Sequence, residues 1–195
     1  MTPSAARQST DKFHMTQNDR AIRQRTFQSS SPATTRALGQ QLGRILDGGE
    51  VIGLVGDLGS GKTTFTKGLS EGLGFGDPRQ VCSPTYVLEH IYQARLRIHH
   101  YDAYRLDSAD EFLALGFEEQ LTDNDAVLVV EWADRVANVL PQNGLKIEFL
   151  FSGPSASGDV RGSAEHEHRE LVFSGPEIFW SSRLDDLKFR PSRGG

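Results

Sequence analysis

Gly56-Asp57-Leu58-Gly59-Ser60-Gly61-Lys62-Thr63 is the most informative segment of this chain. It lies between the apolar run 51–55 and a helical pattern that begins near Lys62. Its three glycines let the backbone turn tightly and bring amides close to a polyanion, because no Cβ blocks the approach. A strand, a glycine-rich loop of this spacing and a helix together predict a nucleoside triphosphate site.

The helix after the loop supplies the next part of the expected site. Its unpaired N-terminal amides and positive dipole end favour phosphate. Lys62 adds a full charge for the β and γ phosphates, and the Thr63 hydroxyl can ligate a Mg²⁺ ion that bridges them. Thr64 can add a further donor. The loop therefore predicts both a nucleotide and a magnesium ion.

Composition excludes several other classes of protein. With 195 residues, one domain with tails is expected. A net charge of −5 argues against a protein that mainly coats nucleic acid, although a partner that carries RNA stays open. The single cysteine, Cys82, fits a reducing compartment. No apolar run approaches the ~20 residues of a membrane span, so we expect a soluble, cytoplasmic protein.

We expect the folded domain to span residues 26–187, with a flexible tail over 188–195. The segment 1–25 lacks the apolar region of a secretory signal. We interpret it as a disordered extension or, if Met15 is the true first residue, as a misassigned start, and we favour an organelle transit peptide less. The Gly/Ser-rich segment 152–162 predicts a mobile loop.

The phosphate-binding loop, together with strand-like and helix-like runs around it, predicts an α/β fold of the P-loop NTPase type, a three-layer sandwich around a mixed sheet. The sheet is mixed because the strand-like runs 86–92 and 96–101 predict an antiparallel hairpin. The other expected elements are a helix capped by Ser31 and ended at 48–49, a short helix with a capping box at 108–111, strands at 126–130, 145–151 and 170–173, and a last helix at 177–187.

Two carboxylates are candidates to complete the site, because such sites need an acid at the carboxyl end of a neighbouring strand. Glu131 follows the most hydrophobic strand, as expected of the acid on the metal side. Asp102 follows a weaker strand and could instead position the attacking water or orient a switch segment. Either residue could also be a helix cap or a surface carboxylate.

Other residues near these strands give weaker signals. Thr85, in the segment 83–85, could sense the γ-phosphate, or Pro84 could make this an ordinary turn. Trp132 could stack on a base or a partner, but packing is the favoured interpretation. The six histidines show no spacing typical of a structural zinc site, so we expect solvated or core side chains.

Four motifs together resemble one family, TsaE, also called YjeE, the bacterial ATPases needed to make threonylcarbamoyladenosine in tRNA. These motifs are the loop at 56–64, Ser-Pro-Thr-Tyr at 83–86, Tyr-Asp-Ala-Tyr-Arg-Leu at 101–106 and Val-Glu-Trp at 130–132. The resemblance covers residues 26–187, and the four motifs in this order are far more specific than the loop alone.

The resemblance implies a Mg²⁺-dependent P-loop ATPase that supports the TsaB and TsaD proteins while they transfer the threonylcarbamoyl group to the adenosine beside the anticodon. It would meet tRNA only through that complex. Thr63 and Glu131 would hold Mg²⁺, and Thr85 and Asp102 would belong to the switch and catalytic region with Lys62. The residues expected to contact ATP are Gly59, Ser60, Gly61, Lys62, Thr63, Thr64 and His168.

We see no convincing arginine finger in the sequence, so we expect slow hydrolysis that partner proteins accelerate. Two alternatives stay open. A small-molecule P-loop kinase would need a lid with several arginines, and the chain has only scattered ones. A nucleotide-gated assembly factor would use ATP binding alone, without obligatory hydrolysis. A GTPase is disfavoured, because no Asn-Lys-x-Asp segment occurs.

Overall fold

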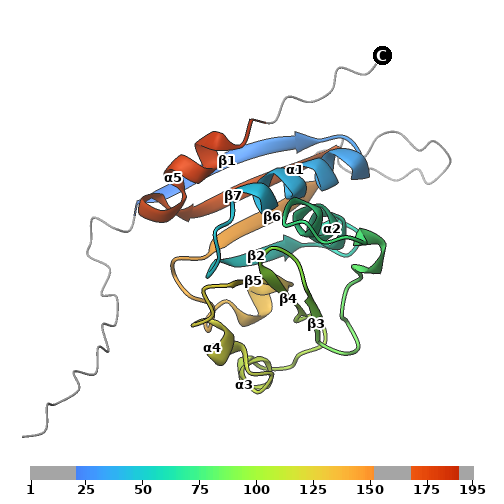
Figure 1. The fold of residues 1–195 in the computed structure, drawn as a ribbon, viewed down its shortest axis with the longest axis vertical. Helices are drawn as coiled ribbons and strands as arrows, with labels where there is room; N and C mark the ends of the chain where they lie inside the picture. Colours follow the sequence, from blue (N-terminus) through green and yellow to red (C-terminus); the bar gives the residue numbers. More distant parts are fainter. Residues whose placement is uncertain (1–20, 152–167, 189–195) are drawn as a thin grey trace, which may run out of the picture.

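The computed structural model describes residues 21–151 and 168–188 and shows an α/β fold built on one seven-stranded mixed sheet (Figure 1). Among the helices in these ranges, none combines the length and the hydrophobicity that a membrane span requires. The strand order is β1-β7-β6-β2-β5-β4-β3. The strands are β1 (Ile22–Ser29), β2 (Val51–Gly56), β3 (Glu89–Tyr92), β4 (Arg97–Asp102), β5 (Ala126–Glu131), β6 (Leu145–Phe151) and β7 (Arg169–Pro176). The helices are α1 (Pro32–Ile45), α2 (Lys62–Gly72), α3 (Ala109–Leu113), α4 (Phe117–Gln120) and α5 (Glu177–Asp186), with 3₁₀ turns η2 (Pro78–Gln80) and η3 (Ala133–Val136).

The centre of the sheet brings three strand ends to one edge. β2 runs parallel to β5 and to β6, and β4 runs parallel to β5. Their carboxyl ends therefore lie together, which places Gly56, Glu131 and Asp102 at a common edge, with Asp102 the register partner of Glu131. β3 pairs antiparallel with β4, so the predicted hairpin is confirmed.

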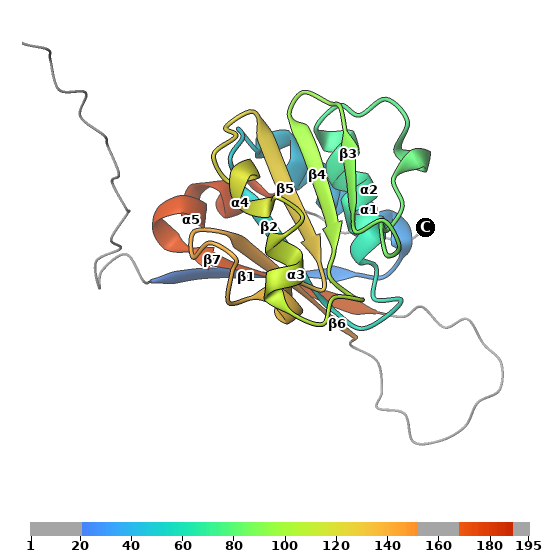
Figure 2. The same cartoon turned by 90° about the horizontal axis from the view of Figure 1, so that it is seen from below.

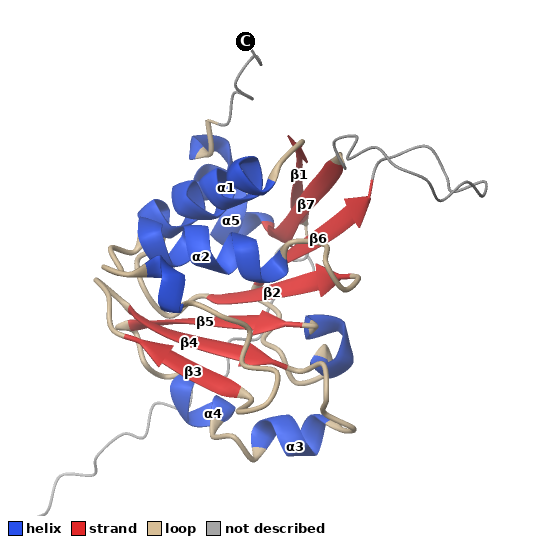
Figure 3. Ribbon diagram, turned by 90° about the vertical axis from the view of Figure 1, so that its right-hand side faces the viewer, coloured by secondary structure: helices blue, strands red, loops and turns tan. Residues whose placement is uncertain are grey.

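Helices α1, α2 and α5 cover one face of the sheet (Figure 3). The side chains between them and the sheet form a buried aliphatic and aromatic core, in which the Phe65 ring meets the rings of Phe149 and Phe173 edge to face. Ser31 accepts a hydrogen bond from the Thr34 amide and caps α1, as the sequence predicts. α1 is followed in the chain by β2.

The other face carries α3 and α4 (Figure 2), and η3, which follows β5, packs against β2. Here the Tyr101 ring packs edge to face on Phe112 and Phe117. This layer does not extend over β6, where Lys146 and Leu150 alternate with buried residues and are exposed. The three-layer arrangement expected from the sequence therefore applies to the centre of the sheet, and the second face of β6 is open.

Several boundaries differ from those expected. β1 begins at Ile22, before the expected domain start at residue 26, and pairs antiparallel with β7. β3 begins at Glu89 instead of residue 86, because a turn precedes it in which the Leu88 amide donates to the Pro84 carbonyl. α4 follows the left-handed Gly116, where the sequence indicates only a helix end. The predicted loop at 152–162, the segment 1–20 and residues 189–195 lie outside the described residues.

Close approach of α1 and α2 depends on glycine, which gives a first prediction. A Cβ added to Gly68 would lie 1.9 Å from the Arg36 carbonyl oxygen, and backbone atoms cannot move aside cheaply. We expect Gly68→Ala to lower the free energy of unfolding by about 1–3 kcal/mol or more, because overpacking a tight contact usually destabilises a protein by this amount. Urea denaturation measures the change. Gly76→Ala is the control, because a Cβ there meets nothing within 4 Å. Equal effects of the two substitutions would contradict the packing argument.

Candidate nucleotide site

A cavity of about 320 Å³ opens at the carboxyl edge of β2, β5 and β4. We call it the loop cavity. Its walls come from the glycine-rich loop, the start of α2, the segment before β3, and the residues that follow β4 and β5. The lining residues are Leu58, Gly59, Gly61, Lys62, Thr63, Thr64, Ser83, Thr85, Asp102, Tyr104, Glu131 and Trp132.

The loop presents uncapped helix amides at this cavity. Gly61 precedes α2 in the left-handed conformation, with a φ of 107°, and no side chain caps the helix. The first N–H groups of α2 therefore lack the side-chain acceptor that helix starts usually have. Gly59 also has a positive φ, of 78°, and space around it in which a Cβ would meet nothing within 4 Å. These features fit a phosphate group, which supplies acceptors and negative charge at once.

Lys62 lies at the bottom of the cavity with only 4% of its surface exposed. Its Nζ donates to the carbonyl oxygen of Asp57 at 2.8 Å and sits 3.9 Å from the centre of the Trp132 ring. Burial lowers the pKa of the amine, and the nearby carboxylate of Glu131 opposes this shift. The ammonium is thus held by dipoles and by the π face of an aromatic ring, close to where phosphate would bind.

Trp132 reaches that position through a strained backbone. It adopts the left-handed conformation, with a φ of 59°, directly after β5. A bulky residue rarely takes this conformation unless its surroundings impose it, and such strain is common at functional sites. The turn brings its ring to Lys62 and to Tyr104, 4.9 Å away between ring centroids. The sequence favours a packing role, and the structure shows a contact with the site lysine as well.

Glu131 and Thr63 form a pair of oxygen donors across the cavity. The Thr63 hydroxyl donates to Oε2 of Glu131 at 3.0 Å, and Oε1 of Glu131 accepts from Nε2 of His100 at 2.9 Å. Hydroxyl and carboxylate oxygens are the ligands that Mg²⁺ prefers, usually completed by phosphate and water. In the described part of the chain, no group of three His, Cys, Asp or Glu side chains could hold a metal ion alone. The pair therefore fits an ion that the nucleotide helps to bind.

Asp102 holds the segment before β3 against the cavity. Its Oδ2 accepts from the Thr85 hydroxyl at 2.9 Å and also from the Ser83 hydroxyl. Its Oδ1 accepts from the Tyr104 amide at 2.8 Å. Asp102 is 2% exposed, so each bond is shielded from water. The carboxylate of Asp102 therefore fixes the position of the segment before β3 beside the cavity.

Most of the predicted site residues meet at the loop cavity, and two do not line it. Ser60 is buried under the loop, where its hydroxyl accepts a long bond of 3.4 Å from Lys62. His168 is exposed at the start of β7, and β6 separates that strand from β2. The sequence interpretation missed the contacts of Trp132 and His100. The signal in the sequence is proximity alone: Trp132 directly follows Glu131, and His100 lies two residues before Asp102.

Comparisons with known proteins identify the family to which this sequence is similar. The family model described as "Threonylcarbamoyl adenosine biosynthesis protein TsaE" matches residues 29–155. The tRNA threonylcarbamoyladenosine biosynthesis protein TsaE of Treponema pallidum is 41% identical over 114 residues, which are 58% of this chain and 82% of that protein. The protein of the same description from Bacillus subtilis is 37% identical over 133 residues, 68% of this chain and 81% of that protein.

A solved structure has the same fold. The crystal structure of Bacillus subtilis YdiB superimposes on this chain with a TM-score of 0.63 at 27% sequence identity, and the match covers 86% of this chain and 95% of that chain. The resemblance seen in four short motifs therefore extends over the domain. The chain belongs to the TsaE family of tRNA threonylcarbamoyladenosine biosynthesis proteins, a family of P-loop ATPases.

Proposed function

We propose that this chain binds ATP with Mg²⁺ in the loop cavity and hydrolyses it to support partner proteins of the TsaB and TsaD type in the cytoplasm. Those partners would transfer the threonylcarbamoyl group to tRNA, which this chain meets only through them. Membership of the TsaE family supports the pathway. The observation that carries the ATPase proposal is the union, in one cavity, of an uncapped helix start, Lys62 and the Thr63–Glu131 pair.

Each residue has a distinct role in this proposal. The loop amides and Lys62 hold the β and γ phosphates and offset the charge that develops on the transferred phosphoryl group. Thr63 and Glu131 would hold Mg²⁺, which would supply positive charge to offset that of the phosphates. Asp102 and Thr85 lie together at the same cavity, where they order the segment before β3 and orient the attacking water. Catalysis here is mostly positioning and charge stabilisation.

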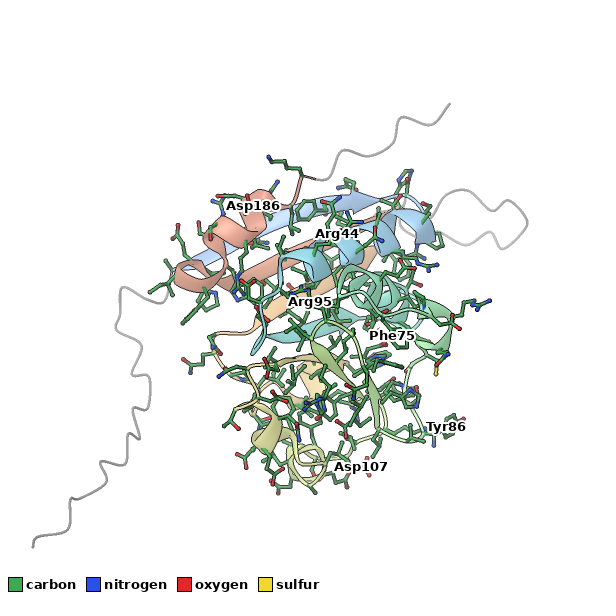
Figure 4. The ribbon with its side chains drawn as sticks, in the orientation of Figure 1. Arg44, Phe75, Tyr86, Arg95, Asp107 and Asp186 are labelled. Atoms are coloured by element: carbon green, nitrogen blue, oxygen red, sulfur yellow. The ribbon has the colours of Figure 1, made fainter. Side chains whose placement is uncertain are left out.

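The cavity is incomplete for fast hydrolysis. None of the described residues that line it is an arginine, the residue that stabilises the transition state in many related enzymes and that a kinase lid would also require. Apolar side chains stand exposed beside it: Leu58 on the loop is 80% exposed and Tyr86 81%. Tyr86 projects from the edge of the molecule (Figure 4), with the Arg105 guanidinium 4.3 Å from its ring centre. These exposed side chains beside the cavity support the proposal that partner proteins act on the site directly.

Stimulation by partners is therefore the second prediction. We expect slow phosphate release by the isolated chain and a large acceleration when TsaB and TsaD proteins of the same organism are added. Arginine supplied in trans gives about 10³- to 10⁵-fold elsewhere, which sets an upper range. The measurement is ATP turnover with each partner alone and with both. Fast turnover by the isolated chain, unchanged by partners, would contradict partner gating without affecting the case for ATP binding.

A further inference from the structure

His100 makes a contact that none of the roles above uses. It lies on β4, fully buried, and its Nε2 stands 2.9 Å from Oε1 of Glu131 on β5. Side chains alternate along a strand, so His100 and Asp102 share one face of β4 while His99 and Tyr101 point to the other. The sheet therefore places an imidazole next to the carboxylate proposed to hold Mg²⁺, at the oxygen that Thr63 does not contact.

The two oxygens of Glu131 have different tasks in this arrangement. Oε1 accepts from the imidazole, and Oε2 accepts from the Thr63 hydroxyl at 3.0 Å. Without His100, only the Thr63 hydroxyl would hold the carboxylate of Glu131, which could then rotate about its Cγ–Cδ bond. Because His100 also holds Oε1, and β4 is fixed in the sheet, Oε2 stays directed toward Thr63 and the cavity. A metal ion bound beside Thr63 would meet an oxygen already in place.

The other ring nitrogen indicates which tautomer is present. Nδ1 of His100 is buried, and among the described residues it has no hydrogen-bond partner. A hydrogen atom on Nδ1 would be a buried donor without an acceptor, which is costly, whereas a hydrogen on Nε2 is used by Glu131. The geometry is thus that of a ring that donates through Nε2.

We propose that His100 is a positioning residue for magnesium: by donating from Nε2 to Oε1, it fixes Glu131 so that Oε2 faces the metal position beside Thr63. The inference rests on the proposed ATPase function and adds a residue to it. Hydrogen-bond partners that orient metal ligands are worth about 10- to 100-fold in metal affinity or activity when removed. His100 should therefore affect the magnesium-dependent part of nucleotide binding and leave the phosphate contacts of the loop unchanged.

The test measures the dissociation constant of ATP by calorimetry, once with Mg²⁺ and once with EDTA. The ratio of the value in EDTA to the value with Mg²⁺ reports how much the metal strengthens binding. We expect His100→Leu to reduce this ratio about 10- to 100-fold while the affinity in EDTA stays close to that of the wild type. His100→Gln, whose amide keeps a donor near the same place, should recover most of the ratio. His99→Leu is the matched control, because it removes an equally buried ring that bonds Glu89 at 2.7 Å and lies outside the loop cavity.

The outcomes separate this inference from the proposed function. A wild-type protein that gains nothing from Mg²⁺ would contradict the proposed function itself. A normal ratio in His100→Leu, or equal losses in His100→Leu and His100→Gln, would overturn the role of His100. If His100→Leu does not fold, ¹⁵N NMR of the wild-type imidazole decides: hydrogen on Nε2 supports the donor role, and hydrogen on Nδ1 alone excludes it.

Discussion

Lys62→Ala is expected to lower ATP hydrolysis by about 10²- to 10³-fold, the loss that follows removal of one preorganised electrostatic group, and to weaken ATP binding as well. Lys62 is the lysine that lines the loop cavity, and its Nζ is held by loop carbonyls and by the Trp132 ring. A truncated side chain leaves the phosphates without this charge. Phosphate release and calorimetric titration with Mg·ATP measure the two effects.

Lys67→Ala is the matched control for Lys62→Ala. It removes the same charge from the same helix, at a position that does not line the loop cavity. We expect its hydrolysis rate and ATP affinity to remain near those of the wild type. If the two alanine variants lost activity equally, or if Lys62→Ala bound and hydrolysed ATP normally, the site would be elsewhere and the proposed function would fail.

The buried charge of Lys62 should lower the free energy of unfolding. Burial lowers the pKa of Lys62 below its ordinary value of 10.5, so the unfolded chain binds this proton more tightly than the folded one. The cost is fully present below the lowered pKa and disappears as pH rises toward 10.5. Relative to Lys62→Met, which carries no charge, the wild type should therefore gain stability between neutral pH and pH 10. Urea unfolding at the two pH values measures the difference.

Local chemistry explains why the centre of the fold was predictable from the sequence. The loop needs glycines and Lys62 within eight residues, and the buried strand β5 reads as a continuous apolar run. The rule that an acid follows a neighbouring strand then found Glu131 and Asp102, which the structure pairs in register. These features depend on residues that are close together in the chain.

The parts that the sequence did not reveal depend on contacts between distant segments. β1 pairs with β7 across most of the chain, and half of its side chains are exposed, so it lacks an apolar run. The link from His100 to Glu131 requires that β4 and β5 be neighbours in the sheet, which spacing alone does not specify. The left-handed backbone at Trp132 could not be predicted from local preference, because a bulky residue takes this rare conformation only where its surroundings impose it.

Glu131→Gln is expected to reduce ATP hydrolysis by about 10²- to 10³-fold while the protein stays folded and still binds ATP. The amide can keep both contacts, since its oxygen can accept from His100 and its nitrogen can donate to the Thr63 hydroxyl, so the loss comes from the missing charge on the metal side. Glu89→Gln, at the pair that half-buried Glu89 forms with buried His99, is the control and should retain activity. Glu131→Gln also distinguishes an obligatory ATPase from an assembly factor that needs only ATP binding. If Glu131→Gln bound ATP, did not hydrolyse it and still supported tRNA modification by the partners in full, ATP binding would be the essential step; loss of modification together with turnover is the result we expect.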